Sequence, residues 1–336
     1  MKKARFKTLR LAVLLFGLVL LGVFFIFITD FSGGKEPGWG VTFSRSYALD
    51  LQLDWRQAYL AMLDELKISH LRLSAYWDEL EPEKDEYNFS DLDWQLEQAE
   101  ARGVSVILAV GRRLPRWPEC HDPAWLKHYS SEEANAELLA LLELTIKRYQ
   151  DRPSIIAWQV ENEPLFAWFG FCPPPDKAFF ATEVALVRQL DPQRPVMVTD
   201  TGELSSWLEV SAFGDVVGTT LYRVVWNKWF GFWDYWFVPP AWYRWKADLT
   251  QAVHPNVKTV MISELQMEPW TFSKKMVELS RAEQERSFDL WRFRDNIAYV
   301  RRTGFPSVYL WGVEYWYWLH QQGDDVFWNE AKGLWQ

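Results

Sequence analysis

The amino-acid sequence predicts an α/β protein whose main part is a (β/α)8 (TIM) barrel, on three observations. Apolar runs, loops and amphipathic helical stretches alternate at intervals of roughly 30–45 residues, as in successive βα units. Eight apolar runs of this kind occur. The 336 residues are enough for one barrel, which needs about 250 residues or slightly more. A doubly wound open sheet is the alternative, but no glycine-rich nucleotide-binding motif follows the first expected strand.

Each expected strand is a short apolar run that ends where polar residues begin, and the expected helices lie between these runs. Gly103 follows the second helix, where a glycine commonly ends a helix, and Ser130 or Ser131 can cap the third. We expect strands at residues 38–43, 70–74, 104–110, 155–160, 195–199, 216–220, 258–263 and 307–313. We expect helices at residues 55–66, 92–102, 131–150, 177–190, 242–253, 282–303 and 329–334.

The N-terminal end predicts a membrane anchor. Residues 1–10 form a basic tail that is expected to stay in the cytoplasm, and residues 11–28 form an uncharged run of 18 residues, a length that suits a transmembrane helix. Residues 29–38 are then a linker, and residues 39–336 form a barrel domain at the cell surface or in the periplasm. Secretion after signal-peptide cleavage is the alternative, with Ser32-Gly33-Gly34 as a weak cleavage site.

The charge distribution argues against a nucleic-acid partner. The formal net charge is −9, and five of the 36 basic residues lie in the first ten positions, which leaves 31 basic against 45 acidic residues in the remainder. Such an acidic domain repels phosphate backbones. The 22 Trp residues favour a carbohydrate partner, because an indole ring can stack on a sugar, although a Trp-rich core would have the same composition.

The two cysteines, Cys120 and Cys172, suggest a disulfide if the domain is exported. In the expected barrel both would lie in loops on the same rim. A metal site is the alternative, with His121 beside Cys120, but two cysteines and one histidine do not make a ligand set. We therefore expect no metal.

Two carboxylates that follow expected strands carry the functional prediction. The run 155–160 is followed by Glu161, Asn162 and Glu163, and the run 258–263 is followed by Glu264. The C-terminal ends of barrel strands form the active-site rim, so these side chains can face each other. Glycoside hydrolysis with retention of configuration needs two carboxylates about 5 Å apart, one as acid/base and one as nucleophile.

The motif Trp158-Gln159-Val160-Glu161-Asn162-Glu163-Pro164, with Glu264 at the end of the seventh expected strand, resembles clan A glycoside hydrolases. The resemblance covers roughly residues 39–336. It implies that Glu163 is the acid/base, that Glu264 is the nucleophile and that Asn162 binds the sugar 2-hydroxyl.

The same resemblance implies that Arg72 and Tyr222 support the nucleophile and that Trp311 forms the floor of the sugar subsite. The stretch Tyr76-Trp77-Asp78-Glu79-Leu80-Glu81-Pro82 is similar to the region after strand two in family 42 and related β-glycosidases. The sequence departs from the clan pattern at two places. Many members have a histidine where Thr220 stands, and another near the stretch Gly111-Arg112-Arg113.

Further rim residues are candidate substrate contacts. The loop after the third expected strand either contacts the substrate or is a solvated charged loop. Its candidate residues are Arg112, Arg113, Trp117, Glu119 and His121. After the last strand, on its end or in a loop, Glu314, Trp316 and Trp318 either line the sugar site or are structural. Glu161 is expected to be a buried or rim hydrogen-bonding group, and Glu268 is expected to bind substrate or solvent.

The segment 224–245 contains eleven aromatic residues. It is interpreted as an aromatic wall for a glycan chain, as a lid that enters the membrane interface, where Trp and Tyr favour the headgroup level, or as a satellite core under a long loop. The membrane interpretation would also allow a lipid-linked glycan as substrate.

The sequence thus predicts a membrane-anchored, retaining glycosidase that hydrolyses O-glycosyl bonds of a β-linked extracytoplasmic glycan or glycoconjugate by double displacement. This chemistry requires no cofactor. A transglycosylase would use the same carboxylates. A non-catalytic, membrane-tethered glycan-binding barrel is the alternative from a different functional class.

Overall fold

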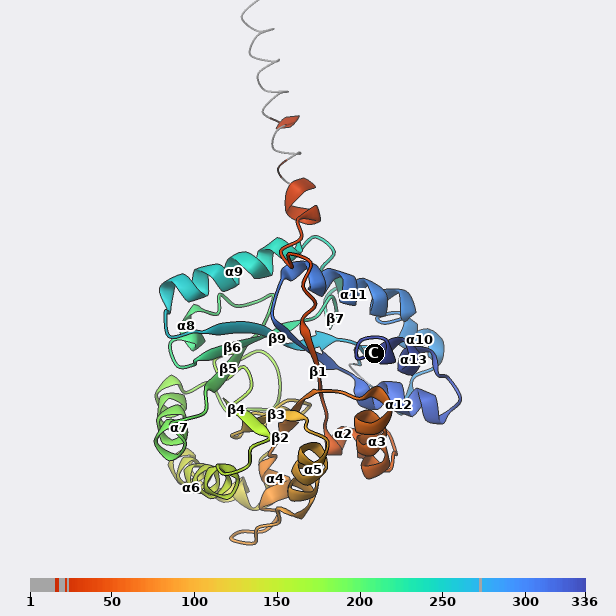
Figure 1. Ribbon diagram of the computed structural model, residues 1–336. Coiled ribbons are helices and arrows are strands. Elements are labelled where there is room, and N and C mark those ends of the chain that lie inside the picture. The colour runs from red at the N-terminus through yellow and green to blue at the C-terminus, as the bar shows by residue number, and fades with distance from the viewer. Residues whose placement is uncertain (1–15, 18–21, 23, 272–273) are drawn as a thin grey trace, which may run out of the picture.

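The computed structural model describes residues 16–17, 22, 24–271 and 274–336. Its eight main strands are all parallel and close into one barrel, with helices arranged around it (Figure 1). The closed circle of strands confirms the predicted (β/α)8 barrel and shows that the open, doubly wound alternative is wrong.

The barrel strands are neighbours in the order β1-β10-β9-β6-β5-β4-β3-β2, and β2 pairs with β1 to close the circle. Their near-continuous apolar sequences fit this position, because parallel strands are buried on both faces. The strands are β1 (Gly38–Thr42), β2 (His70–Ser74), β3 (Ser105–Val110), β4 (Ile155–Val160), β5 (Val196–Asp200), β6 (Val216–Leu221), β9 (Thr259–Gln266) and β10 (Ser307–Trp311).

The helices pack their apolar faces against the outside of the barrel. Helix α6 begins at a capping box in which Ser130 accepts from the Glu133 N–H, as the sequence indicated. The helices are α2 (Arg45–Asp50), α3 (Trp55–Ala61), α4 (Trp77–Leu80), α5 (Ser90–Ala101), α6 (Ser131–Tyr149), α7 (Lys177–Leu190), α8 (Leu208–Ser211), α9 (Pro240–Val253), α10 (Arg281–Glu285), α11 (Leu290–Thr303), α12 (Val313–Gln321) and α13 (Val326–Lys332). A π-helical turn, Met62–Leu66, continues α3, and 3-10 turns occur at Ala124–His128 and Met276–Glu278.

The expected single helix over residues 282–303 is wrong, because α10 and α11 are separate. The carboxylate of Asp289 accepts the Arg292 N–H at 2.7 Å and so caps the start of α11. Asp289 itself has an extended backbone, which cannot continue a helix from α10. The residues Glu314, Trp316 and Trp318, expected on a strand end or in a loop, lie on α12.

The aromatic segment 224–245 forms an antiparallel hairpin, β7 (Val224–Asn227) and β8 (Gly231–Asp234), followed by a turn and the first part of α9. Trp229 and Phe230 lie at the hairpin tip and are 75% and 73% exposed. A satellite core is therefore wrong for the tip of this segment, whose rings face outward.

Residues 31–36 lie against the C-terminal end of α11. The Phe31 N–H donates to the Arg302 carbonyl at 3.0 Å, and Arg301 pairs with Glu36 at 2.9 Å. Gly304 permits this crossing, because its φ is +68° and a Cβ there would lie 2.3 Å from the Phe31 carbonyl oxygen.

Most of the predicted anchor, residues 11–28, lies outside the described residues, although residues 24–28 are helical. Within the part of the chain that the structure describes, no helix has both the length and the apolar character needed to cross a membrane.

Candidate active site

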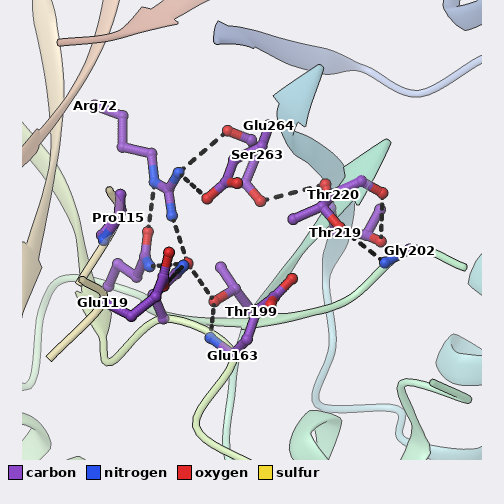
Figure 2. A network of polar contacts seen from close by, with 12 residues as sticks. Arg72, Pro115, Glu119, Glu163, Thr199, Gly202, Thr219, Thr220, Ser263 and Glu264 are labelled. Carbon is purple, nitrogen blue, oxygen red and sulfur yellow. Dashed lines mark hydrogen bonds and ion pairs between the residues drawn. The ribbon is translucent and has the colours of Figure 1, made fainter. Parts of the chain in front are cut away.

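The C-terminal ends of the barrel strands bring one polar network together (Figure 2). At its centre is Glu264, near the end of β9 and 4% exposed. One carboxylate oxygen accepts from the Arg72 guanidinium at 2.8 Å, and the other accepts from the Tyr222 hydroxyl at 2.9 Å. These two donors, one of them a charged guanidinium, fix the orientation of the carboxyl group.

Arg72, on β2, is completely buried and uses its guanidinium to connect three strands. Besides the contact with Glu264, its Nε donates to Gln159 at 2.7 Å and its Nη2 donates to Asn162 at 2.9 Å. A buried guanidinium needs this degree of pairing, since an unpaired charge in the barrel would be strongly destabilising.

Asn162 is oriented by the same network. Its side-chain oxygen accepts from Arg72 and from the Thr199 hydroxyl at 3.1 Å, so its amide nitrogen is directed toward Glu119, which accepts at 3.2 Å. The structure therefore places Asn162 beside the carboxylates, with its orientation set by β2 and β5.

Glu163 follows β4 and is buried, with 8% of its surface exposed. Burial is the largest cause that raises its pKa well above the usual value, and the negative charges of Glu264 and Glu119 raise it further. Its backbone has a φ of +48°, unusual for a residue with a side chain, and its N–H donates to the Thr199 hydroxyl at 2.9 Å. A buried carboxyl with a raised pKa keeps its proton near neutral pH, as a general acid must.

Glu161 has the buried, hydrogen-bonding position that the sequence indicated. Its carboxylate accepts the N–H groups of Arg112 and Arg113 at 2.6 and 2.7 Å. It thereby holds the loop after β3 against the end of β4. Gly111 belongs to this turn, with φ +130°, and a Cβ there would lie 2.3 Å from a Glu161 carboxylate oxygen.

Glu119 is a further buried carboxyl in the site, which the sequence indicated only as a rim residue. Burial and the charge of Glu264 raise its pKa to about 8. The signal that could have found it is its place beside Cys120, whose disulfide partner Cys172 lies in the loop after β4. That bond spans 52 residues and brings the two loops together, with a Cα–Cα distance of 5.2 Å.

Arg116 is the main residue that the sequence reasoning missed. Its buried guanidinium lies 3.8 Å from the centre of the Tyr47 ring and 4.0 Å from the centre of the Trp311 ring. It also pairs with Glu268 and, at 3.0 Å, with Glu314. One face of Trp311 is thus covered by an arginine, and both acids bind this cation.

Burial raises the pKa of Glu314 to about 7, although the charge of Arg116 opposes that rise. The Glu314 carboxylate also accepts the Ser44 N–H at 2.5 Å. His121 is buried, with its ring 4.2 Å from the Tyr76 ring and its Nε2 3.2 Å from the Arg116 carbonyl oxygen. Both residues therefore hold the loop that carries Arg116.

Trp117, in contrast, is 56% exposed on the rim. It belongs to a row of aromatic contacts that leads from Tyr222 through Trp270 and Phe169 to Trp117, with ring-centre distances of 5.5, 5.9 and 5.5 Å. Such a row offers flat apolar surfaces beside the central carboxylates, as a sugar ring requires.

The position of the clan histidine in strand six holds Thr220. Its hydroxyl accepts the Gly202 N–H at 2.9 Å, so it fixes the loop after β5 (Figure 2). Gly202 is close-packed there, since a Cβ would lie 1.9 Å from the Thr220 carbonyl oxygen. In this chain the position therefore holds a hydroxyl that contacts the backbone of the loop after β5.

A hollow of about 270 Å³ lies on the same rim beside the end of β4. Its lining includes Leu165, two residues after Glu163, and Asp200 at the end of β5. A second hollow of about 190 Å³ includes Lys258 and Thr259, at the beginning of β9, and so lies at the other end of the barrel, away from the carboxylates. The first hollow is bounded by the loop that follows Glu163 and by the loop after β5, and its lining does not include Glu163 or Glu264.

The model of the family described as cellulase (glycosyl hydrolase family 5) matches residues 42–312, most of the chain. Among curated proteins, the chain is similar to three β-galactosidases, two of them from Clostridium species. It is 27% identical over 142 residues to Pbg of Clostridium perfringens, covering 34% of this chain, and 22% identical over 190 residues to BgaA of Clostridium cellulovorans, covering 48% of this chain. It spans only 19% and 27% of the lengths of those relatives.

Among solved structures, the barrel is similar to a family 42 β-galactosidase from G. stearothermophilus, with a TM-score of 0.56 and 16% identity over 85% of this chain and 51% of that one. It is also similar to xylanase 10B from Thermotoga petrophila, with a TM-score of 0.54 and 14% identity over 82% of this chain and 81% of that one. At such identities these likenesses concern the fold.

Proposed function

Because this chain belongs to the cellulase family, glycosyl hydrolase family 5, we propose that it hydrolyses β-linked glycosides with retention, using Glu163 as acid/base and Glu264 as nucleophile. Family membership makes it a clan A glycosidase that acts on O-glycosyl bonds.

One observation carries the proposal: Glu264 is held by Arg72 and Tyr222, while the pKa of the neighbouring Glu163 is raised. Glu163 therefore keeps its proton near neutral pH, whereas both oxygens of Glu264 accept hydrogen bonds, one from a guanidinium and one from a phenol. This asymmetry is what a double displacement needs, since one group must attack as a carboxylate and the other must donate a proton.

In the first step Glu264 attacks the anomeric carbon, the glycosidic bond breaks, and the Glu163 proton passes to the leaving oxygen. In the second step Glu163, now ionised, takes a proton from water as that water attacks the anomeric carbon and releases Glu264. Asn162 is positioned to donate its amide to a hydroxyl of the sugar if Glu119 moves or shares the bond.

We further propose that the chain is anchored in a membrane through residues 11–28, with the barrel outside the cytoplasm. The basic N-terminal flank, the uncharged run and the disulfide between Cys120 and Cys172 support this location. The substrate is then a glycan or glycoconjugate outside the cytoplasm, and the names of the β-galactosidase relatives support a β-linked sugar.

The test is turnover of aryl β-glycosides and β-glycans by the full-length chain. We expect loss of nearly all turnover in Glu264→Gln, and recovery by azide in Glu163→Ala, because azide needs no general base. The first product observed by NMR should keep the β configuration. Glu143→Gln, at an exposed position of α6, is the matched control.

An inverted first product would contradict the mechanism. Equal binding of a glycan by all of these proteins without cleavage would favour a glycan-binding barrel instead.

A further inference from the structure

The outer face of α9 is apolar although it is exposed. Of the six exposed positions in this helix, five are apolar, and the sixth is Asp248. Trp242, Trp245 and Leu249 are 45%, 49% and 52% exposed. Their spacing of three and four residues places them in one stripe along the helix. Residues Tyr243 and Ala247 on the other side are buried and pack into the core.

Helix α6 provides a comparison within the same barrel. Its exposed positions include Glu132, Glu133, Glu143, Lys147 and Arg148. That composition is typical of a helix face in contact with water. The exposed face of α9 is therefore more apolar than that of α6, where Leu144 is the one large apolar side chain among the exposed described residues.

The hairpin before α9 continues the apolar surface. Trp229, Phe230 and Trp236 are 75%, 73% and 70% exposed. Rings follow one another from Phe230 through Trp233 to Phe237, with centres 5.8 and 6.3 Å apart. Trp229 and Phe230 are at the tip, beside the exposed Lys228, so the two strands project aromatic rings with a cation next to them.

The N-terminal segment leaves the barrel on this side. Arg302, near the end of α11, donates to the Phe27 carbonyl at 2.8 Å, and α11 packs directly against α9. Figure 1 shows the helical residues 24–28 departing beside α9 and α11. An anchor over residues 11–28 would therefore enter a bilayer on the side of the barrel where the apolar stripe is exposed.

We propose that this surface, the aromatic face, docks on the lipid bilayer, with Trp229, Phe230, Trp236, Trp242, Trp245 and Leu249 in the headgroup region. This deepens the proposed function and depends on its anchoring. Trp favours that depth because its ring is apolar and its N–H can still be hydrogen-bonded. Lys228 can meet lipid phosphates at the same level.

The composition of the aromatic face favours lipid over a glycan chain. A sugar site combines flat rings with several hydrogen-bonding side chains, because each ring of the substrate carries hydroxyl groups. Along α9 the exposed polar side chain is Asp248, and it is paired with Arg244 at 2.7 Å. A bilayer interface needs no such partners.

Docking also orients the candidate active site. Gln266, two residues after Glu264, exchanges hydrogen bonds with the backbone of Val224 in β7, at 2.9 and 2.7 Å. Tyr222, which contacts Glu264, lies two residues before that strand. The hairpin is therefore tied to the barrel mouth, and its contact with lipid would hold the mouth close to the membrane. The substrate class this predicts is a glycan joined to, or lying on, the membrane surface.

The test uses the full-length chain reconstituted in vesicles of phosphatidylethanolamine and phosphatidylglycerol that contain a photoreactive phosphatidylcholine. After illumination, lipid adducts are mapped by mass spectrometry. We expect adducts at the hairpin tip and on the α9 stripe. The matched positions are Trp168 and Phe171, which are 82% and 74% exposed in the loop after β4 and should carry few adducts.

A triple variant, Trp242→Ser with Trp245→Ser and Leu249→Ser, should lower the adduct yield at the hairpin by about tenfold, since each side chain removed takes apolar area out of the bilayer contact. The control double variant, Trp168→Ser with Phe171→Ser, should leave that yield unchanged. Cleavage of a soluble aryl β-glycoside by the same samples reports the proposed catalysis separately.

Adducts no more frequent on the aromatic face than at Trp168 and Phe171 would overturn the docking proposal, even if catalysis is normal. Protection of Trp242 and Trp245 from radical oxidation by cellohexaose would then assign the face to a glycan chain. A chain that does not float with the vesicles would overturn both docking and anchoring.

Discussion

At the residue scale, the candidate nucleophile depends on donors from two different strand ends. Arg72 comes from β2 and Tyr222 follows β6, and each donates to a different oxygen of Glu264. The arginine supplies charge and the phenol supplies orientation. Their contributions can be separated, because only the arginine also holds Gln159 and Asn162.

Replacing Tyr222 by Phe removes one hydrogen bond to Glu264 and leaves the ring in place. A hydrogen bond to a charged group contributes about 1.5–3 kcal/mol, so we expect kcat to fall by about 10- to 100-fold. KM should change little. The measurement is steady-state kinetics on an aryl β-glycoside. Tyr315→Phe is the control, because that hydroxyl donates to Gln284, away from the carboxylates; an equal loss there would contradict the assignment.

Glu119 affords a test of the electrostatics. Its pKa, raised to about 8 by burial and by the charge of Glu264, means that it ionises above that pH and then adds a negative charge near Glu163. Glu119→Gln removes this charge, so the pKa of Glu163 should fall. We expect the basic limb of kcat/KM against pH to move to lower pH, measured from about pH 4 to about pH 10. A basic limb that does not move would show that the charge of Glu119 does not affect the pKa of Glu163.

Arg116 shows why single residues of the site escaped the sequence analysis. It lies in a loop, where no periodic pattern defines the direction of a side chain. Its partners Tyr47, Glu268 and Trp311 are distant in the sequence. Only the closure of the barrel, which places β10 beside β1, brings them together.

At the element scale, the loops after β3 and β4 form one unit around the site. Arg113 donates to the carbonyls of Phe166 and Phe169 at 2.6 and 2.8 Å, and its own carbonyl accepts the Asn162 N–H at 2.6 Å. The Cys120–Cys172 disulfide joins the same loops. The two loops therefore position Asn162 and Glu119 together.

Replacing both Cys120 and Cys172 by Ser should destabilise the fold by up to about 4 kcal/mol, the loop-closure value for the 52-residue separation. Urea unfolding measures this change. We also expect kcat/KM to fall, since Glu119 is adjacent to Cys120 in the sequence. Dithiothreitol should lower the free energy of unfolding of the wild type and leave that of the double variant unchanged. A wild type whose stability is insensitive to reduction would contradict this prediction.

At the scale of the whole molecule, buried carboxyls should make the stability fall as the pH rises. The pKa of Glu119 is raised to about 8 and that of Glu314 to about 7, both chiefly by burial, and burial also raises the pKa of Glu163 well above its usual value. A group with a raised folded pKa contributes stability that is complete below its unfolded pKa and is lost as the pH rises through the folded value.

We therefore expect the free energy of unfolding to decrease from about pH 5 to about pH 8, by roughly 1.4 kcal/mol for each unit of pKa shift that is titrated. Asp93 and Asp191 have lowered pKa values, so their stabilisation is lost only under more acidic conditions. Urea unfolding at several pH values tests the trend, and Glu119→Gln should flatten it. A free energy of unfolding that rises over this pH interval would show that burial does not determine the pKa values of these carboxyls.

The sequence alone determined the barrel and the two central carboxylates. Strands that are buried on both faces have continuous apolar sequences, and acidic residues follow them directly where the strand ends face a polar cavity. Both features can therefore be recognised from consecutive residues in the sequence. Most helix boundaries that depend on local capping residues could be predicted from the sequence. The separation of α10 from α11 at Asp289 was missed because the helical sequence pattern continues across that residue.

The tertiary structure alone decided which loop residues meet. The Tyr47–Arg116–Trp311 stack, the burial of Glu119 and the exposure of the α9 stripe depend on which elements become neighbours when the strands close. Sequence spacing cannot encode such contacts, because their partners lie in different βα units. Whether an aromatic side chain is buried or exposed likewise depends on whether another element covers it. Trp242 and Trp245 stay exposed because none of the described residues fully covers them.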